Sequence, residues 1–187
     1  MEYLKQFQKH ISENQLAPLI SLWQEYSFCD EVDPNELQAI LNAISKSPFA
    51  TSFGKYVEEI LPLWEKLPEG DDKRALIRHI VDLETTNTET LRSIVGDEIT
   101  KCYQNDPQFA RLLKIVGSKD RPSFQGILTH LELLTHLKPK NFCYHTKGWG
   151  VGEVIDVSFV REQVSCEFDY VAGKKDLSFA NALNCLI

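Results

Sequence analysis

The sequence has no long apolar run, and this absence limits what the chain can be. No stretch approaches the roughly 20 apolar residues that a membrane-spanning helix needs. The first ten residues, MEYLKQFQKH, carry charges throughout and have no apolar core of the kind found in secretory signals. Disorder-like composition is also missing, since 43% of the residues are hydrophobic and 25% are charged. We therefore expect a folded cytoplasmic protein without a membrane partner.

Closely spaced cysteines are missing as well. The five cysteines are odd in number and widely separated, and no CxxC occurs. This pattern argues against a disulfide framework and favours reduced thiols. They are Cys29, Cys102, Cys143, Cys166 and Cys185. Cys143 and Cys166 fall in strand-like patterns, where we expect them to be buried as small hydrophobic residues.

Clustered positive charge is the third absence. The net charge is −7, and residues 138–187 hold six acids and six bases, so the acidic excess falls on residues 1–137. Neutralising phosphates requires grouped lysines and arginines. We therefore expect no direct, sequence-specific contact with nucleic acid, and we favour protein partners with basic or mixed surfaces.

The first 137 residues do contain clear helical periodicity. Apolar residues recur at helical spacing in LAPLISLW, YVEEILPLW, ALIRHIVDL, FARLLKIV and GILTHLELLTHL. Asp33 as N-cap, Pro34 in the first turn and Glu36 as capping-box partner predict one helix start. The pair Asp106–Pro107 predicts another. The loops are short, so we expect neighbouring helices to pack antiparallel.

A weak internal repetition accompanies the helices. A shift of 41 residues places Trp23 on Trp64, and a shift of 35 residues gives a further set of identities. These are Lys66 with Lys101, Asp71 with Asp106, Ala75 with Ala110, Ile80 with Ile115 and Val81 with Val116. Such a period is the size of one helical hairpin in a solenoid, although amphipathic helices of similar composition also produce matches. Either origin predicts an array of helix pairs with both tryptophans in the core.

The apolar period changes to two after residues 138–140, which we interpret as a hinge. One expected strand places Ile155, Val157 and Phe159 on one face. Two others alternate through Val164, Cys166, Phe168 and Tyr170, and through Leu177 and Phe179. Arg161–Glu162 and Ala172–Lys174 are the expected turns. We therefore predict a multidomain α+β chain, with an all-α, solenoid-like array of helical hairpins over residues 1–137 and a small β-barrel over residues 141–187.

The segment HTKGWGVGEVIDVSF, residues 145–159, raises the question of phosphate binding. A phosphate-binding glycine loop opens a helix, whereas a strand follows here and no GK[ST] occurs. The alternative is a tight turn, in which Gly148 and Gly150 permit positive φ and Gly152 lets another backbone approach closely or makes room for a bend of the barrel. Trp149 then either caps the barrel core or serves as an exposed anchor at an interface.

The carboxyl-terminal segment resembles a Tudor/SH3-like barrel. It is similar to the RNA-polymerase-interacting modules of CarD-type regulators, of transcription-repair coupling factors and of the tail of UvrD-type helicases. The matching positions are His145, Gly150, Gly152, Val154, Val164 or Cys166, Phe168, Leu177, Ala180 and Leu183.

The whole chain resembles the long amino-terminal extension of an enlarged form of the bacterial transcript-cleavage factor GreA. The resemblance is carried by LISLWQEY, FGKYVEEILPLWEKL, DRPSFQGILTHLELLTHL and FCYHTKGWGVGEVIDVSFVREQV. It implies a non-catalytic module of a transcription elongation factor that binds RNA polymerase, and DNA binding by the full-length family. The long coiled coil of Gre factors, which carries the catalytic acids, has no counterpart here. We therefore expect this chain to be a domain of a longer protein that does not itself stimulate RNA cleavage.

No residue set forms a catalytic constellation. His130 and His136 lie on different helical faces, and neither they nor Cys143 and His145 supply two ligand pairs at zinc spacing. A thiol nucleophile at Cys143 would lack a positioned third group. The acidic run at residues 29–34 lacks the glycine and glutamate of a calcium loop. We expect no enzyme activity, no metal, no cofactor and no small-molecule ligand.

The residues that we expect to contact a partner lie in and after the glycine turn. They are His145, Lys147, Trp149, Lys174 and Lys175. An exposed strand edge in the barrel would supply backbone hydrogen bonds to the same partner. The alternative interpretation is a helical-repeat adaptor that binds a peptide or protein unrelated to transcription.

Overall fold

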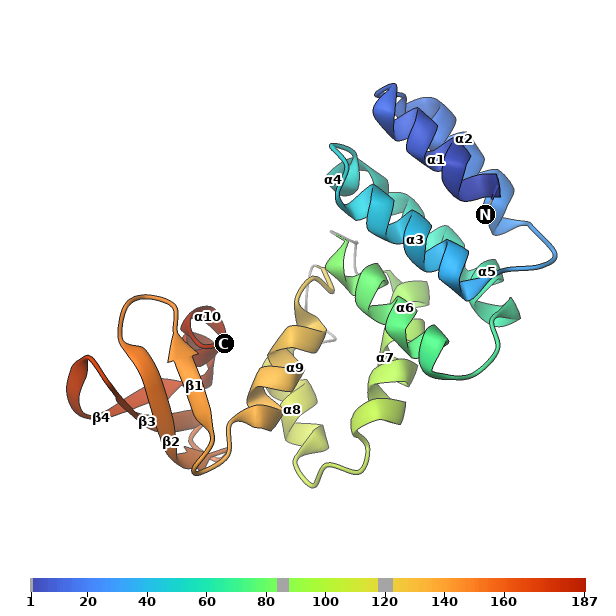
Figure 1. Cartoon of the computed structure of the whole chain (residues 1–187). Helices are drawn as coiled ribbons and strands as arrows, with labels where there is room; N and C mark the ends of the chain where they lie inside the picture. The colour runs from blue at the N-terminus through green and yellow to red at the C-terminus, as the bar shows by residue number, and fades with distance from the viewer. Residues whose placement is uncertain (1, 84–87, 118–122) are drawn as a thin grey trace. The chain divides into compact units, whose positions relative to one another are not determined.

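The structure, a computed structural model, describes residues 2–83, 88–117 and 123–187, apart from the side chains of Glu58 and Asp82 (Figure 1). The elements in order are α1 (Glu2–Ser12), α2 (Leu16–Ser27), α3 (Pro34–Ser45), α4 (Ala50–Phe53), the 3-10 helix η1 (Gly54–Ile60), α5 (Leu61–Lys66), α6 (Asp71–Asp82), α7 (Glu89–Tyr103), α8 (Phe109–Val116), α9 (Ile127–His136), β1 (Phe142–His145), β2 (Gly150–Ser158), β3 (Gln163–Phe168), β4 (Val171–Ser178) and α10 (Phe179–Cys185). The α+β class is confirmed. A solenoid-like array and an SH3/Tudor-like barrel remain predictions.

Contacts between residues group the described chain into two compact units. The first holds α1 to α7, and the second holds α8 to α10 together with the four strands. Two helices that precede the expected hinge at residues 138–140 therefore belong to the same unit as the sheet. The division into domains 1–137 and 141–187 remains a prediction.

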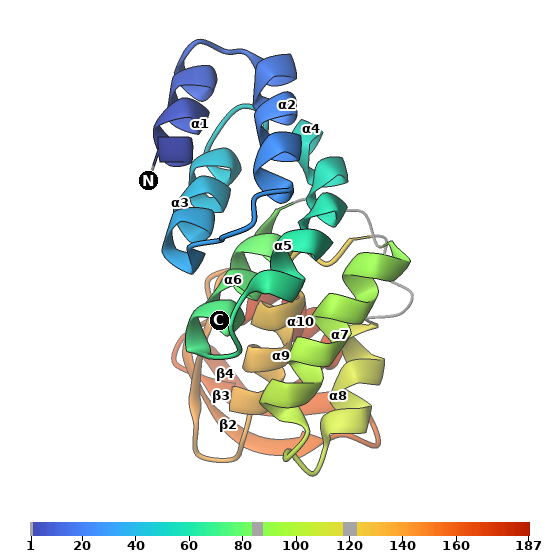
Figure 2. The same ribbon diagram turned by 90° about the vertical axis from the view of Figure 1, so that its right-hand side faces the viewer.

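The first unit is built from helices that bury aromatic side chains. Helix α1 packs against both α2 and α3 (Figure 2). Trp23 is fully buried and its indole Nε1 donates to the carbonyl of Tyr56 at 3.1 Å, while its ring meets that of Phe53 edge-on. Trp64 is also buried. The expectation that both tryptophans lie in the core is confirmed.

The helix starts agree only in part with the sequence pattern. Asp33 caps α3 as predicted, since its Oδ1 accepts from the amide of Asn35 at 2.9 Å and Pro34 begins the helix. Glu36, expected to complete a capping box on the same helix, instead reaches α1, where its Oε1 accepts from the amide of Leu4 at 3.1 Å. A buried carboxylate on α3 thus satisfies an otherwise unpaired first-turn donor of another helix.

The second predicted start is displaced along the chain. The side chain of Asp106 accepts from the amide of Gln108 at 2.7 Å, and α8 begins only at Phe109. Asp106 and Pro107 therefore form the turn before the helix and not its first positions.

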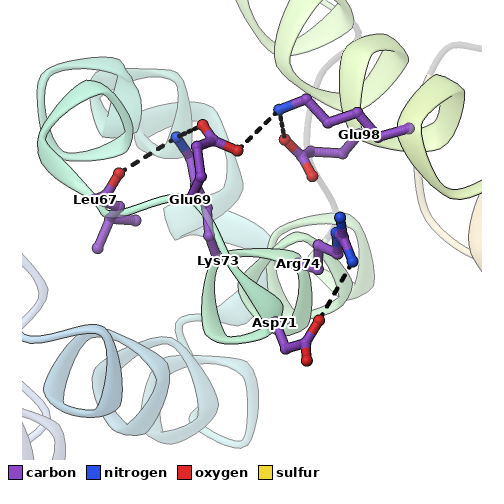
Figure 3. A network of polar contacts seen from close by, with 7 residues as sticks. Leu67, Glu69, Asp71, Lys73, Arg74 and Glu98 are labelled. Carbon is purple, nitrogen blue, oxygen red and sulfur yellow. Dashed lines mark hydrogen bonds and ion pairs between the residues drawn. The ribbon is translucent and has the colours of Figure 1, made fainter.

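A polar network joins the segment after α5 to α6 and α7 in the first unit (Figure 3). Lys73 is 6% exposed and donates to Glu69 at 2.8 Å. Its ammonium lies 5.1 Å from the ring centroid of Trp64. Lys101 donates to Glu69 at 3.1 Å and to Glu98 at 2.8 Å. Hydrogen bonds from Lys73 and Lys101 hold the pKa of Glu69 below its ordinary value of 4.5.

Glu69→Gln is expected to make the first unit less sensitive to acid. The lowered pKa means that ionised Glu69 contributes stability above about pH 4.5, and that this contribution is lost as the pH falls through the lowered value. The difference in stability between wild type and variant should therefore shrink toward zero in acid. Urea unfolding across this pH range measures it, and a difference that stayed constant with pH would contradict the prediction. Because Glu69 is exposed, high salt should reduce the difference at every pH.

The second unit contains a four-stranded antiparallel sheet in the order β1-β2-β3-β4. Val164, Cys166, Phe168 and Leu177 are buried on its inner face, as the alternation predicts. After β4, helix α10 returns the chain to the free edge of β1. There Tyr144 exchanges backbone hydrogen bonds with Ile187 at 2.9 and 3.1 Å.

Several details of the predicted strands are wrong. Tyr170, expected on the buried face, is 78% exposed and follows the end of β3, and Phe179, expected on a strand, begins α10. The buried face of β2 runs through Gly152 and Val154, so alternation turns Ile155 outward, where it is 39% exposed. The pairing with β3 becomes irregular between Val154 and Asp156. An extra residue at such a bulge exchanges the two faces beyond it. The segment Ala172–Lys174, expected as a turn, lies inside β4.

Candidate functional site

The glycine segment forms the connection between β1 and β2. His145 pairs with Gly150 at the end of the ladder, and the amide of Gly148 donates to the carbonyl of His145 at 3.2 Å. Gly148 has φ +95° and Gly150 has φ +82°, values that residues with side chains rarely adopt. The interpretation as a tight turn agrees with this geometry, since strand β2 follows the glycines directly.

Gly152 has a different role, which is to leave room for a ring. It lies on the buried face of β2, and a Cβ atom at this position would fall 2.5 Å from two ring carbons of Phe168. Strand β3 carries Phe168 directly opposite Gly152 in the register. The close approach at Gly152, expected from another backbone, is made instead by the side chain of Phe168 on the neighbouring strand.

Three aromatic rings pack together at this end of the sheet. The rings of His145 and Trp149 stack with centroids 4.2 Å apart and an interplanar angle of 6°. Phe168 meets both of them edge-on, at 5.5 Å from His145 and 5.4 Å from Trp149. His145 is 4% exposed, and its Nδ1 is buried with no hydrogen-bond partner among the described residues, while Trp149 is half-buried. The tryptophan is thus packed on one side and reachable on the other.

An open hollow of about 570 Å³ lies beside this stack. Its lining consists of His145, Lys147, Trp149, Leu177, Asn181, Asn184 and Cys185. A cation, an indole and two amide side chains are the groups that anchor a partner's side chain and fix its orientation. The hollow brings together three of the five expected contact residues, namely His145, Lys147 and Trp149.

The other two expected contact residues lie elsewhere in the sheet. Lys174 and Lys175 belong to β4, where Lys174 is exposed and lies 4.0 Å from Asp176. Strand β4 is an outer strand of the sheet, and it carries Gly173 at φ +73° beside an irregularity in its pairing with β3. Bulges and lysines on an outer strand are typical of edges that resist pairing with another chain.

Asn181 and Asn184 are the lining residues that the sequence interpretation missed. They lie on α10. Ser178 caps the start of this helix, because the Oγ of Ser178 accepts a hydrogen bond from the amide of Asn181 at 3.2 Å. A serine before an apolar, alanine-containing segment is a recognisable helix-start signal. It would have predicted α10, but not that α10 faces the glycine turn.

The buried thiols are packed away from solvent. Cys143 and Cys166 are both buried, as predicted, with their sulfur atoms 3.9 Å apart. The contact with Cys143 and burial raise the pKa of Cys166, and burial raises the pKa of Cys185. Raised pKa values oppose nucleophilic chemistry at Cys166 and Cys185, whereas the hydrogen bond to Cys166 lowers the pKa of Cys143. Among the residues that the structure describes, no three histidine, cysteine or acidic side chains are grouped as metal ligands.

Within residues 2–83, 88–117 and 123–187, every helix is too short or too polar to cross a bilayer.

Comparison with known proteins finds two curated relatives that are similar in sequence over this whole chain. No protein-family model matches the chain, and no solved structure does. A curated protein of Chlamydia pneumoniae is 41% identical over 186 residues, and one of Chlamydia trachomatis serovar D is 40% identical over 187 residues. In both cases the alignment covers the whole of this chain and 26% of the relative, so the chain spans about a quarter of their length. Both relatives are named transcription elongation factor GreA, and this chain is thus similar, along its entire length, to part of two proteins of that name.

Proposed function

We propose that this chain is a non-catalytic module of a GreA-like transcription elongation factor, and that it binds RNA polymerase and thereby contributes to the control of elongation. The observation that carries the proposal is the 40–41% identity over the full chain to proteins named transcription elongation factor GreA. The packing of His145 against Trp149 beside an open hollow supports a binding role.

We place the polymerase contact at the hollow beside Trp149. Of the two outer edges of the sheet, β1 is already paired with Ile187, and β4 carries a bulge and Lys174. Both edges therefore disfavour strand addition. The hollow instead presents the half-buried indole of Trp149 and the exposed ammonium of Lys147. His145, which is buried, acts here by holding the indole in place through ring stacking.

Trp149→Ala is expected to weaken binding to RNA polymerase by about 2 kcal/mol, a value typical of an aromatic anchor. The measurement is a titration of the purified chain against core RNA polymerase at low salt, paired with a melting curve of each variant. Lys147→Ala serves as the comparison, because it removes a contact while leaving the ring stack intact, and we expect a smaller loss.

The two measurements separate the outcomes. Weaker binding at an unchanged melting temperature supports the anchor role of Trp149. A loss of affinity accompanied by a lower melting temperature would show that the tryptophan acts only through the fold. If the wild-type chain failed to associate with polymerase at micromolar concentration, the proposed function itself would be wrong.

A further inference from the structure

The outer face of the sheet carries an apolar surface that no described part of the chain covers. Alternation along β1 turns Cys143 and His145 inward, where each is 4% exposed. The same alternation turns Phe142 and Tyr144 outward, and they are 62% and 47% exposed. Two aromatic residues in one short strand are a costly group to leave in water.

The strand register makes these side chains neighbours. Tyr144 lies opposite Val151 of β2, which is 44% exposed, and on its other side it exchanges backbone hydrogen bonds with Ile187. Directly paired residues present their side chains on the same face of a sheet. We call the group of Phe142, Tyr144, Val151 and Ile187 the outer face. Contiguous exposed apolar groups of this kind mark interaction surfaces.

Two carboxylates adjoin the outer face. Glu153 lies opposite Phe142 on one side and opposite Glu167 on the other, so two acids face each other directly across β2 and β3. Like charges in this position repel. The carboxylates of Asp156 and Asp176 lie within 4.0 Å of Arg161 and Lys174 respectively. For Glu153 and Glu167, which we call the acid pair, the described residues supply no such cation.

At Ile187 the apolar surface continues into a hollow of about 380 Å³ that is lined by residues of α9 and α10. Leu133, Leu183 and Leu186 contribute to its lining together with Ile187. The outer face and this hollow therefore form one longer apolar surface. The hollow adjoins the outer face at Ile187, and the acid pair adjoins it at Phe142.

We propose that the outer face and the acid pair together form a second docking surface, which takes a protein segment carrying apolar side chains and at least one lysine or arginine. The apolar groups of the partner cover Phe142 and Tyr144, and its cation lies between the two carboxylates and removes their repulsion. Complementary charge beside an aromatic centre is the usual arrangement of selective interfaces. The proposal does not depend on polymerase binding, because none of its residues lines the hollow beside Trp149.

The negative charge of the acid pair disfavours other kinds of partner at this surface. The acid pair repels the phosphates of nucleic acids and the headgroups of anionic lipids. A symmetric dimer through this surface would bring two acid pairs into one interface. A basic and apolar protein segment is the occupant that relieves the repulsion.

The test uses two synthetic peptides of about ten residues, a length typical of a long strand. One alternates lysine and valine, and its twin has glutamate in place of each lysine. Fluorescence anisotropy at low salt measures binding of each peptide to the full chain. We expect the lysine peptide to bind at least about tenfold more tightly than its twin. Tyr144→Ser should abolish most of that binding, and combining Glu153→Lys with Glu167→Lys should reverse the preference.

Val160→Ser is the matched control, since Val160 is 81% exposed, lies outside the outer face and should leave binding unchanged. Melting curves identify any variant that fails to fold, and Phe142→Ser then replaces Tyr144→Ser. Equal binding of the two peptides, or a preference that the charge exchange leaves unaltered, would overturn the proposal. Sedimentation experiments provide a further test. If the wild-type chain self-associated and Tyr144→Ser abolished this self-association, the occupant would be a second copy and the proposal would be wrong.

Discussion

Gly152→Ala is expected to lower the free energy of unfolding of the second unit by about 3 kcal/mol, the upper end for an overpacked core. The added methyl group would lie 2.5 Å from the ring of Phe168, well inside contact distance. That ring cannot simply turn away, because it is 6% exposed and packs edge-on against both His145 and Trp149. Urea or thermal unfolding monitored by tryptophan fluorescence measures the effect.

Gly148→Ala provides the control for this substitution. It makes the same chemical change in the turn that precedes β2, where no atom lies within 4 Å of the added methyl group, and φ is +95°. Only backbone strain should then matter, at about 1 kcal/mol. A second variant, Gly152→Ala combined with Phe168→Leu, should recover part of the loss by removing ring atoms. If Gly152→Ala were as stable as wild type, the ring would not be what requires a glycine here.

Lys101→Met is expected to destabilise the first unit by about 2–3 kcal/mol, because it leaves a buried carboxylate without its cation. The side chain of Glu98 is 2% exposed, and Lys101 donates to it at 2.8 Å. Hydrogen bonds to Glu98 and Glu69 raise the pKa of Lys101 above its ordinary value, as expected for a cation stabilised by both acids. We place the effect below that of a fully buried pair because the side chain of Lys101 is 42% exposed.

Arg74→Met is the matched control for this ion pair. Arg74 and Asp71 have the same spacing on a helix, but both side chains are largely exposed, at 53% and 96%. Their pair should contribute no more than about 0.5 kcal/mol. Adding Glu98→Gln to Lys101→Met removes the unpaired charge and should restore most of the lost stability. Equal effects of Lys101→Met and Arg74→Met on the urea midpoint would show that burial of Glu98 does not matter.

Local backbone preferences could be read directly from the sequence. The change of apolar period from helical spacing to two separates the helices from the sheet at about the position that the structure shows. Asp33 and Pro34 predict the start of α3, and the glycines at 148 and 150 predict the turn between β1 and β2. Each of these features depends on φ and ψ values that a few neighbouring residues impose, so no knowledge of the rest of the chain is needed.

Contacts between distant residues were decided only by the tertiary structure. The glutamate at position 36 fits a capping box, yet it bonds to Leu4 of another helix. The lysine at position 174 fits a turn, yet it lies in β4. Gly152 is required because β3 places Phe168 opposite it, and Asn181 and Asn184 reach the hollow because α10 carries the chain back to β1. Periodicity describes one element at a time, whereas register and packing depend on which side chains fill the same space, and that is settled only when the elements come together.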